Sequence, residues 1–194
     1  MDIQYPDGAT PLDADETEGL LLTHITTREE LNRWEQQNIT EAEDWAFGRK
    51  QKSILSQGYI CRLHKKMFGN VWKWAGQFRK SMKNLGIEPW RIASETGLVC
   101  EDATAWIDHE TYSADEIATR LHHKLVWIHP FANGNGRHAR MMADIVLVQG
   151  LETKPFTWGS LELIKPGESR SKYIKALQAA DNHDFTLLLE FVRS

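Results

Sequence analysis

The sequence predicts a mainly α-helical domain that takes up most of its 194 residues. Serine or threonine followed three residues later by glutamate stands ahead of several apolar stretches, and this spacing is typical of a helix start. Within those stretches apolar residues recur every three or four positions, as they do on one face of a helix. Helical periodicity fails in two regions, residues 71–91 and 152–166. We therefore expect a helical bundle with one small β-hairpin.

Four helix starts are predicted in the first third of the chain. They lie at Thr10-Pro11, ahead of a short helix over residues 11–18, and at Thr27, Thr40 and Ser56. In each case a side chain that can accept a hydrogen bond precedes the first helical N–H groups. Gly19 and Gly69 are expected to end the first and the last of these helices. His64, on the last of them, is interpreted as part of a solvent-facing side together with the neighbouring lysines.

Residues 71–91 alternate aromatic, basic and glycine residues without helical spacing. A strand–turn–strand hairpin around Asn84-Leu85-Gly86 is the expected structure. Basic residues interleaved with aromatic ones can also bind nucleic acid. The patch is short and the whole chain is acidic, so a surface hairpin beside a site is the preferred interpretation.

The second half of the chain repeats the helical signals. Ser113 and Glu116 form a capping box that opens an amphipathic helix, and Pro130 ends this helix. A second buried helix follows the next loop and stops at Gly150. Two final helices are expected over residues 171–180 and 185–192, the second one capped by Asp184.

Composition narrows the function classes. The net charge is −4, which gives no support for binding nucleic acid or an acidic membrane surface. Apolar runs are too short to cross a bilayer, and the polar N-terminus does not resemble a signal peptide. Cys61 and Cys100 are far apart and lack metal-ligand spacing. These observations predict a cytoplasmic protein that binds neither nucleic acid nor membrane.

The segment from His129 to Arg140 combines the parts of a phosphate-binding site. Gly134 and Gly136 permit positive φ and a close approach of the backbone, and Asn135 adds an amide side chain. The helix that follows offers unpaired N–H groups at the positive end of its dipole. Two arginines three residues apart can reach one anion, and a histidine can accept a proton near neutral pH.

Plainer interpretations of the same segment are an ordinary tight turn and a histidine bonded to a helix-end carbonyl. A metal site made of His122, His123, His129 and His138 is a further alternative. It is disfavoured because the first two diverge on a helix and because no carboxylate has ligand spacing.

The same segment resembles the signature of the Fic (Fic/Doc) family, His-x-Phe-x-[Asp/Glu]-Gly-Asn-Gly-Arg-x-x-Arg. The matching residues are His129, Phe131, Gly134, Asn135, Gly136, Arg137 and Arg140. Residues 76–79 resemble the lead-in to the family's flap, and residues 173–181 resemble its final core helix. The chain is most similar to the bacterial, toxin-like subgroup called mobile mystery protein B. The resemblance divides the chain into an N-terminal segment, residues 1–26, and a Fic domain, residues 27–194.

The resemblance implies a protein adenylyltransferase that transfers AMP from ATP, with Mg²⁺, to a hydroxyl side chain of a target protein. His129 would deprotonate the hydroxyl, Arg140 would hold the terminal phosphate, and residues 134–137 would cradle the phosphates. Tyr173 and Asp181 would line the adenine pocket. The hairpin would serve as a flap that clamps the target; its residues are Lys80, Ser81, Met82, Lys83, Asn84, Leu85, Gly86 and Ile87. Fic proteins often self-associate, so a homo-oligomer is also implied.

Two positions qualify what the resemblance implies. Asn133 stands where the family usually has a magnesium-binding carboxylate, and asparagine offers only a neutral carbonyl oxygen. Glu18, followed by Gly19, matches the inhibitory pattern [Ser/Thr]-x-x-x-Glu-[Gly/Asn] at two positions and has Ala14 at the first. An ion pair between Glu18 and Arg140 would restrain the enzyme, and an aligned water would also allow AMP removal. The alternatives are a Doc-like kinase or other nucleotidyl transferase, which Gly136 disfavours, and a non-catalytic nucleotide-binding regulator, which Asn133 favours.

Overall fold

The computed structural model describes residues 12–160 and 167–194, and it confirms the mainly helical prediction. The elements in chain order are α1 (Ala14–Thr17), α2 (Arg28–Phe47), α3 (Gln57–Phe68), η1 (Pro89–Arg91), α4 (Ile92–Asp108), α5 (Ala114–Ile128), α6 (Asn135–Ile145), η2 (Val146–Gly150), η3 (Trp158–Ser160), α7 (Glu168–Asp181) and α8 (Thr186–Arg193). The turn η2 is a π-helical continuation of α6, whereas η1 and η3 are short 3₁₀ turns.

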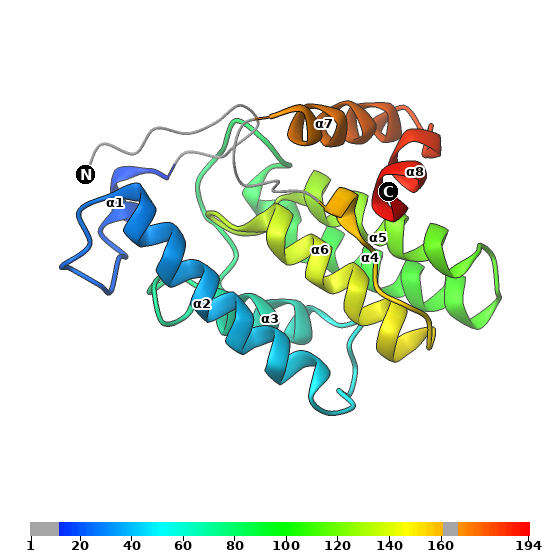
Figure 1. Ribbon diagram of the computed structural model, residues 1–194, viewed down its shortest axis with the longest axis horizontal. Helices are drawn as coiled ribbons and strands as arrows, with labels where there is room; N and C mark the ends of the chain where they lie inside the picture. Colours follow the sequence, from blue (N-terminus) through cyan, green and yellow to red (C-terminus); the bar gives the residue numbers. More distant parts are fainter. Residues whose placement is uncertain (1–11, 161–166) are drawn as a thin grey trace.

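Helices α5 and α6 lie at the centre of the molecule. α5 packs on α4, α6 and α8, and α6 also contacts α2 and α3. Helix α7 packs on α8 and lies on the other side of α6 from α2 and α3 (Figure 1). Residues 129–134 connect the end of α5 to the start of α6, so this loop is held between the two central helices.

Two apolar cores support the bundle. The larger core lies between helices α2, α3, α4, α5 and α6 and includes fully buried aromatic side chains such as Tyr59, Phe68 and Phe131. The smaller core joins α5 and α6 to α7 and α8 and includes Tyr173 and Phe191. A buried side chain of this size contributes about 1.5–3 kcal/mol through removal from water. The connecting loop is therefore anchored at Phe131, which is 0% exposed.

Most helix starts follow the sequence signals, with one exception. Thr27 accepts a hydrogen bond from the Glu30 N–H at 3.2 Å, and Glu30 accepts one from the Thr27 N–H in return. The third signal, at Thr40, is wrong, because α2 continues through it without a break. The Thr40 hydroxyl instead donates to the Gln36 carbonyl one turn earlier, a bond that a threonine inside a helix can make.

The predicted β-hairpin does not form, and the described residues contain no β-strand. Residues 80–87 are an extended loop whose backbone bonds to the end of α5 instead of to itself. The Arg79 N–H donates to the Pro130 carbonyl at 2.9 Å, and the Ile87 N–H reaches the Ile128 carbonyl at 3.4 Å. A hairpin would have needed these groups for its own ladder. We keep the name flap for residues 80–87.

The N-terminal segment packs against the lead-in to the flap. Leu20 and Trp72 form an isolated antiparallel bridge, and the Lys73 N–H donates to the Gly19 carbonyl at 2.8 Å. The predicted helix start at Thr10-Pro11 lies outside the described residues, and α1 there begins at Ala14. None of the helices in the described ranges has the length and apolarity needed to span a bilayer.

Candidate functional site

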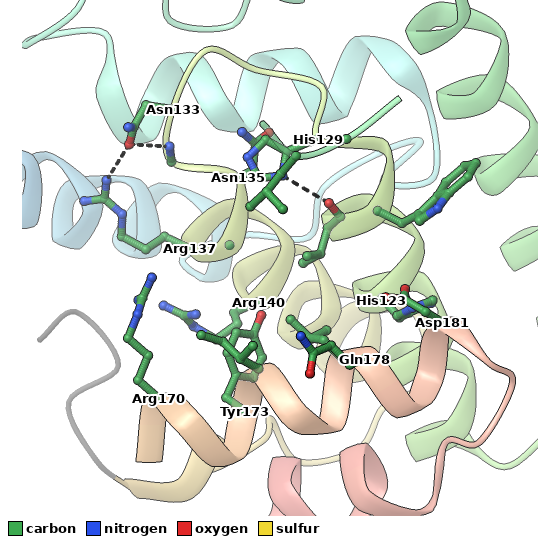
Figure 2. Close-up of a pocket in the computed structure, with 18 of the residues that line it drawn as sticks. His123, His129, Asn133, Asn135, Arg137, Arg140, Arg170, Tyr173, Gln178 and Asp181 are labelled. Carbon is green, nitrogen blue, oxygen red and sulfur yellow. Dashed lines mark hydrogen bonds and ion pairs between the residues drawn. The ribbon is translucent and has the colours of Figure 1, made fainter. Parts of the chain in front are cut away.

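The loop between α5 and α6 begins with a histidine in an unusual backbone conformation. His129 ends α5 with φ of 55°, in the left-handed region, and its N–H still donates to the Leu125 carbonyl at 3.1 Å. Histidine adopts this region more readily than most residues, and Pro130 disfavours a continued helix. The chain therefore turns sharply at His129 and places its side chain at the mouth of the loop (Figure 2).

Asn135 closes the loop with its own side chain. Its Oδ1 accepts from the Phe131 N–H at 2.9 Å, and its Nδ2 donates to the Phe131 carbonyl at 2.8 Å. The side chain is buried, at 3% exposed. The amide side chain therefore shapes the loop, and the Asn135 backbone N–H at the start of α6 remains available for an anion.

The two glycines of the loop serve different purposes. Gly134 has φ of 79°, and a Cβ there would lie 2.6 Å from the Phe68 ring. Positive φ was also expected at Gly136, but that residue is helical, and a Cβ would have only an ordinary contact of 3.8 Å with Arg140 Nη1. Gly136 thus keeps the start of α6 open, and no side chain caps the first N–H groups of that helix.

His64 supports the loop from below, which the sequence interpretation missed. It is 0% exposed and stacks on Phe131 with ring centroids 3.7 Å apart. Its Nε2 lies 3.0 Å from the Asn133 carbonyl, and its Nδ1 accepts from the Gly76 N–H at 3.0 Å. These partners require a neutral ring with the proton on Nε2. The expected solvent-facing position is wrong because the apolar stripe of α3 continues through His64.

The hydrogen bonds of His129 fix its tautomer. Its Nδ1 lies 3.1 Å from the Val126 carbonyl, and a carbonyl can only accept, so the proton is on Nδ1. The basic nitrogen is therefore Nε2. Burial lowers the pKa of His129 to about 4, with smaller contributions in the same direction from the positive charges of Arg79 and Lys83. The imidazole is thus neutral, and able to accept a proton, throughout the physiological pH range.

The two loop arginines have different surroundings. Arg137 Nη1 lies 2.7 Å from Glu35 Oε2, and Glu35 is buried and also accepts from Trp72 Nε1 at 2.7 Å. The guanidinium carbon of Arg140 lies 6.0 Å from the centre of the Tyr173 ring, and no carboxylate in the described part of the chain lies within 4.0 Å of it. The charge of Arg137 is partly neutralised by Glu35. Arg140 is the loop cation better placed to hold an added anion.

A cavity of about 390 Å³ opens between the loop and α7. Loop residues line one side, and Arg170, Tyr173, Gln178 and Asp181 of α7 line the other (Figure 2). With Arg28 from the start of α2, the described residues of the lining include four arginines and one carboxylate, that of Asp181. The net negative charge of the chain gave no indication of this positively charged cavity. Neither Arg28 nor Arg170 was identified from the sequence.

Tyr173 and Asp181 both line this cavity, and their assignment to an adenine pocket stays a prediction. The Tyr173 hydroxyl lies 2.9 Å from His122 Nε2, and its ring faces Arg140. Two turns further along α7, Asp181 Oδ1 lies 2.8 Å from His123 Nε2. The cavity therefore has a cationic end beside Arg140 and an end beside Asp181 that can accept hydrogen bonds.

Arg79 ties the flap to the histidine, although the sequence interpretation gave it no role. Its buried guanidinium donates to four carbonyls, those of His129 at 2.7 Å, Ser81 at 2.8 Å, Ile128 at 3.5 Å and Ile87. Two of these acceptors belong to the end of α5 and two to the flap region. One planar donor group with five N–H bonds thus replaces the ladder of the expected hairpin.

Replacing Arg79 with alanine should lower the free energy of unfolding by about 2–4 kcal/mol, because buried carbonyls lose charged donors. Chemical denaturation of the wild type and the variant measures this loss. Arg91→Ala is the matched control, since the Arg91 side chain is 45% exposed and pairs only with Glu88 and Glu95 on the surface. Equal stability of the two variants would contradict the role given to Arg79.

The predicted ion pair between Glu18 and Arg140 does not form. Glu18 is exposed at the end of α1 and makes no ion pair with any described residue. Helix α1 is a single turn, and it docks through Glu16, whose carbonyl accepts from Trp74 Nε1 at 2.9 Å. Glu18 stays exposed to solvent when the turn docks in this way. An inhibitory role for Glu18 stays a prediction.

The residues of the loop do not supply a charged ligand for magnesium. Asn133 Oδ1 already accepts from the Gly134 N–H at 2.7 Å and lies 3.5 Å from Arg137 Nη2. Within residues 12–160 and 167–194 no three His, Cys, Asp or Glu side chains gather closely enough to hold a metal ion. The four-histidine metal alternative is therefore wrong. His138, for instance, is bonded to the Ile60 carbonyl at 3.0 Å.

Comparison with known proteins agrees with this architecture. Residues 54–147 match the sequence model of the Fic/DOC family. Protein adenylyltransferase Fic of Drosophila sechellia is 28% identical over 146 residues, which cover 73% of this chain and 28% of that protein. The chain thus spans little more than a quarter of the length of the curated relatives it matches.

Two solved structures show the same fold. BepC, a VirB-translocated effector of Bartonella tribocorum with bound AMPPNP, superposes with a TM-score of 0.70 and 14% identity, covering 93% of this chain and 97% of that one. The N-terminal Fic domain of a putative cell filamentation protein of Bartonella quintana, with bound ADP, gives 0.68 and 16%, covering 92% of this chain and 94% of that one.

Proposed function

We propose the following function for this chain, which is a Fic/DOC family protein distantly related to protein adenylyltransferase Fic: it transfers AMP from ATP to a hydroxyl group of a target protein. The observation that carries the proposal is the arrangement of a neutral histidine, the open start of a helix and a cationic cavity around one loop. The bound AMPPNP and ADP of its structural relatives support a nucleotide as the occupant.

His129 acts as the general base in this proposal. Its Nε2 takes the proton of the target hydroxyl while the hydroxyl oxygen attacks the α-phosphorus of ATP. The bond from the α-phosphorus to the bridging oxygen breaks, and pyrophosphate leaves with that oxygen. The Nδ1–H bond to the Val126 carbonyl holds the ring in the tautomer that this step needs. It also stabilises the protonated ring that results.

The phosphates bind at the start of α6. The unpaired N–H groups of residues 135–137 and the helix dipole favour negative charge there. Arg140 binds the terminal phosphates from below, and Tyr173 keeps its guanidinium in place. Arg137 acts mainly through position, because Glu35 holds it against the Phe68 ring, 4.8 Å from guanidinium carbon to ring centre. The adenine base of ATP extends along the cavity toward Asp181.

Magnesium enters this proposal only as a companion of ATP. It would neutralise part of the phosphate charge, and Asn133 would offer it only a neutral amide oxygen, which already accepts from the Gly134 N–H. The other parts of the transfer are carried out by side chains and backbone N–H groups of the protein. A cytoplasmic location and self-association stay predictions from the sequence.

Mass spectrometry of the intact protein, and of lysate proteins incubated with it and Mg²⁺-ATP, tests the proposed function. We expect added mass equal to AMP, both on targets and at low level on the protein itself. Added phosphate would instead identify the Doc-like kinase. ATP binding without any added mass would identify the non-catalytic regulator that Asn133 favours.

A further inference from the structure

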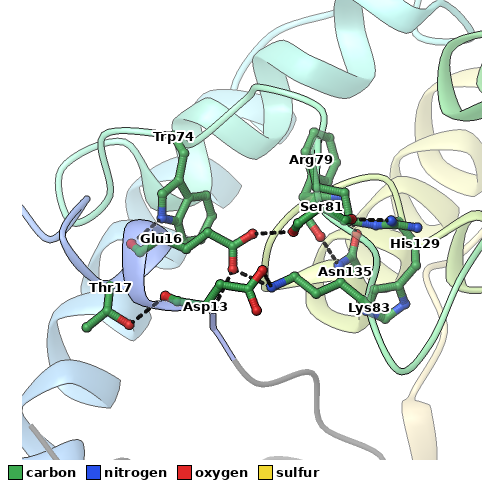
Figure 3. A network of polar contacts seen from close by, with 10 residues as sticks. Asp13, Glu16, Thr17, Trp74, Arg79, Ser81, Lys83, His129 and Asn135 are labelled. Atoms are coloured by element: carbon green, nitrogen blue, oxygen red, sulfur yellow. Dashed lines mark hydrogen bonds and ion pairs between the residues drawn. The ribbon is translucent and has the colours of Figure 1, made fainter. Parts of the chain in front are cut away.

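Helix α1 covers the outer side of the flap through charged side chains. Lys83 Nζ lies 2.9 Å from Asp13 Oδ2 and also contacts Glu16 Oε2, and the Ser81 hydroxyl donates to Glu16 Oε1 at 3.2 Å. Figure 3 shows the Lys83 ammonium between the two carboxylates, with His129 on the side away from α1. The N-terminal segment thus occupies the surface that the target would use.

The contact depends on these side chains rather than on apolar packing. Helix α1 has four residues and none of them is buried. The Lys83 side chain is nevertheless only 2% exposed, and its ammonium group contacts the carboxylates of Asp13 and Glu16. An isolated helical turn is unstable in water, so α1 is held by its Lys83 and Trp74 contacts and by the residues that follow it, where the Lys73 N–H donates to the Gly19 carbonyl. The charged contacts with Lys83 are the part of this attachment that a carboxylate of a target could replace.

Lys83 also lies close to the reacting groups. Its positive charge contributes to the lowered pKa of His129, and Leu85 and Gly86 of the same flap line the nucleotide cavity. Leu85, Gly86 and His129 line the same cavity, so a hydroxyl at His129 lies beside the flap. The residues next to that hydroxyl would then lie near the Lys83 ammonium and the Ser81 hydroxyl.

We infer that the Lys83–Ser81 surface recognises an acidic segment of the target, and that α1 occupies it as an internal competitor. This inference rests on the proposed function. The target carries carboxylates next to the modified hydroxyl, spaced as Asp13 and Glu16 are on one side of a turn. It displaces α1 and places those carboxylates on Lys83. Lys83 is in this way a specificity-determining residue for the protein substrate.

Acylation of lysines by an amine-reactive acetyl ester tests the internal contact without ATP or a target. Mass spectrometry follows Lys83 and, as an internal reference, the exposed Lys80. In the double variant D13N/E16Q, Lys83 should react about fivefold faster or more than in the wild type, because its two charged partners are lost. The matched control is D15N/E18Q, which changes two exposed acids of the same segment that form no ion pair within the described chain.

Equal Lys83 reactivity in the wild type and D13N/E16Q would overturn the internal contact. The control also separates two regulators: raised AMP transfer in D15N/E18Q alone would favour Glu18 as the inhibitor and contradict α1 docking through Lys83. The Lys83 acylation result does not depend on whether the protein transfers AMP, so it can fail independently of the proposed function.

Fluorescence anisotropy tests the substrate class. The probe is a labelled peptide with a serine beside two aspartates spaced three residues apart, and its partner has asparagines in their place. We expect the acidic peptide to bind D13N/E16Q about fivefold more tightly than the wild type, and Lys83→Glu to abolish the preference. Equal binding of the acidic and amide peptides by D13N/E16Q would overturn the recognition of acidic segments.

Discussion

Replacing His129 with alanine is expected to lower the rate of AMP transfer by about 10²- to 10⁴-fold, the usual contribution of a general base. ATP affinity should change little, because the proposed function assigns the phosphates to the start of α6 and to Arg140 rather than to the imidazole. Initial rates with Mg²⁺-ATP and titration calorimetry measure the two quantities separately. A split between transfer and binding identifies a group that acts on the reacting hydroxyl.

The backbone at position 129 requires a second variant. Because φ is 55° there, alanine adds strain of about 1–2 kcal/mol, whereas asparagine adopts this region more readily. His129→Asn should therefore retain wild-type stability and still lose transfer. Substantial transfer by the asparagine variant would show that His129 is not the base.

Acid is expected to unfold the domain at a pH where most proteins of this size remain folded. Burial lowers the pKa of His122 to about 3 and that of His138 and His129 to about 4, and it lowers the pKa of His64 well below its ordinary value. In the unfolded chain each of these histidines binds a proton below about pH 6.5. Between that pH and about 4 the unfolded chain therefore holds more protons, and the free energy of unfolding falls as the pH falls.

The size of this effect follows from the proton linkage. Each histidine that remains neutral in the folded protein lowers the free energy of unfolding by about 1.4 kcal/mol for each pH unit below 6.5. At pH 5 the free energy of unfolding is therefore lower by about 2 kcal/mol per such histidine than at pH 7.5. Several such residues together approach the total stability of a typical domain, about 5–15 kcal/mol. Urea denaturation at pH 7.5 and pH 5 measures the difference. His138→Gln should weaken the pH dependence, whereas His109→Gln, at an exposed position, should not. Equal stability at both pH values would contradict the buried neutral histidines.

Local signals in the sequence predicted the central helices and the position of the loop between them. Ser113 and Pro130 lie directly beside the two ends of α5 that they determine. His129 and Gly134 likewise lie directly beside the helix ends at which the loop begins and ends. The Thr40 signal was wrong because the same side chain can bond backward inside a helix, and packing of α2 on α3 decided between the two.

The supporting residues could not be predicted because their partners are distant in the chain. Glu35 and Arg137 are 102 residues apart, and His64 and Asn133 are 69 apart. Arg79 made the hairpin prediction wrong for the same reason: its acceptors include carbonyls at the end of α5, about fifty positions later. An aromatic and basic stretch without helical periodicity fits a hairpin and a clamped loop equally well.

The N-terminal segment shows a different limit. The match to the inhibitory pattern predicted a glutamate at the site, but the orientation of a single helical turn depends on which of its side chains form contacts. Here Asp13 and Glu16 form ion pairs with Lys83, and Glu18 is exposed. The inhibitory pattern specifies the spacing of residues along α1, but it does not determine which side of that helix packs against the rest of the protein.

The most direct measurement of the central claim is a side-by-side labelling experiment with ATP. Wild-type protein, and the His129→Asn variant as the blank, are incubated with Mg²⁺ and ATP labelled on either the α- or the γ-phosphate. AMP transfer predicts that the α-label enters protein only with the wild type, while the γ-label leaves as pyrophosphate in equal amount. Protein labelled from the γ-phosphate, or α-labelling that persists in the variant, would contradict AMP transfer with His129 as its base.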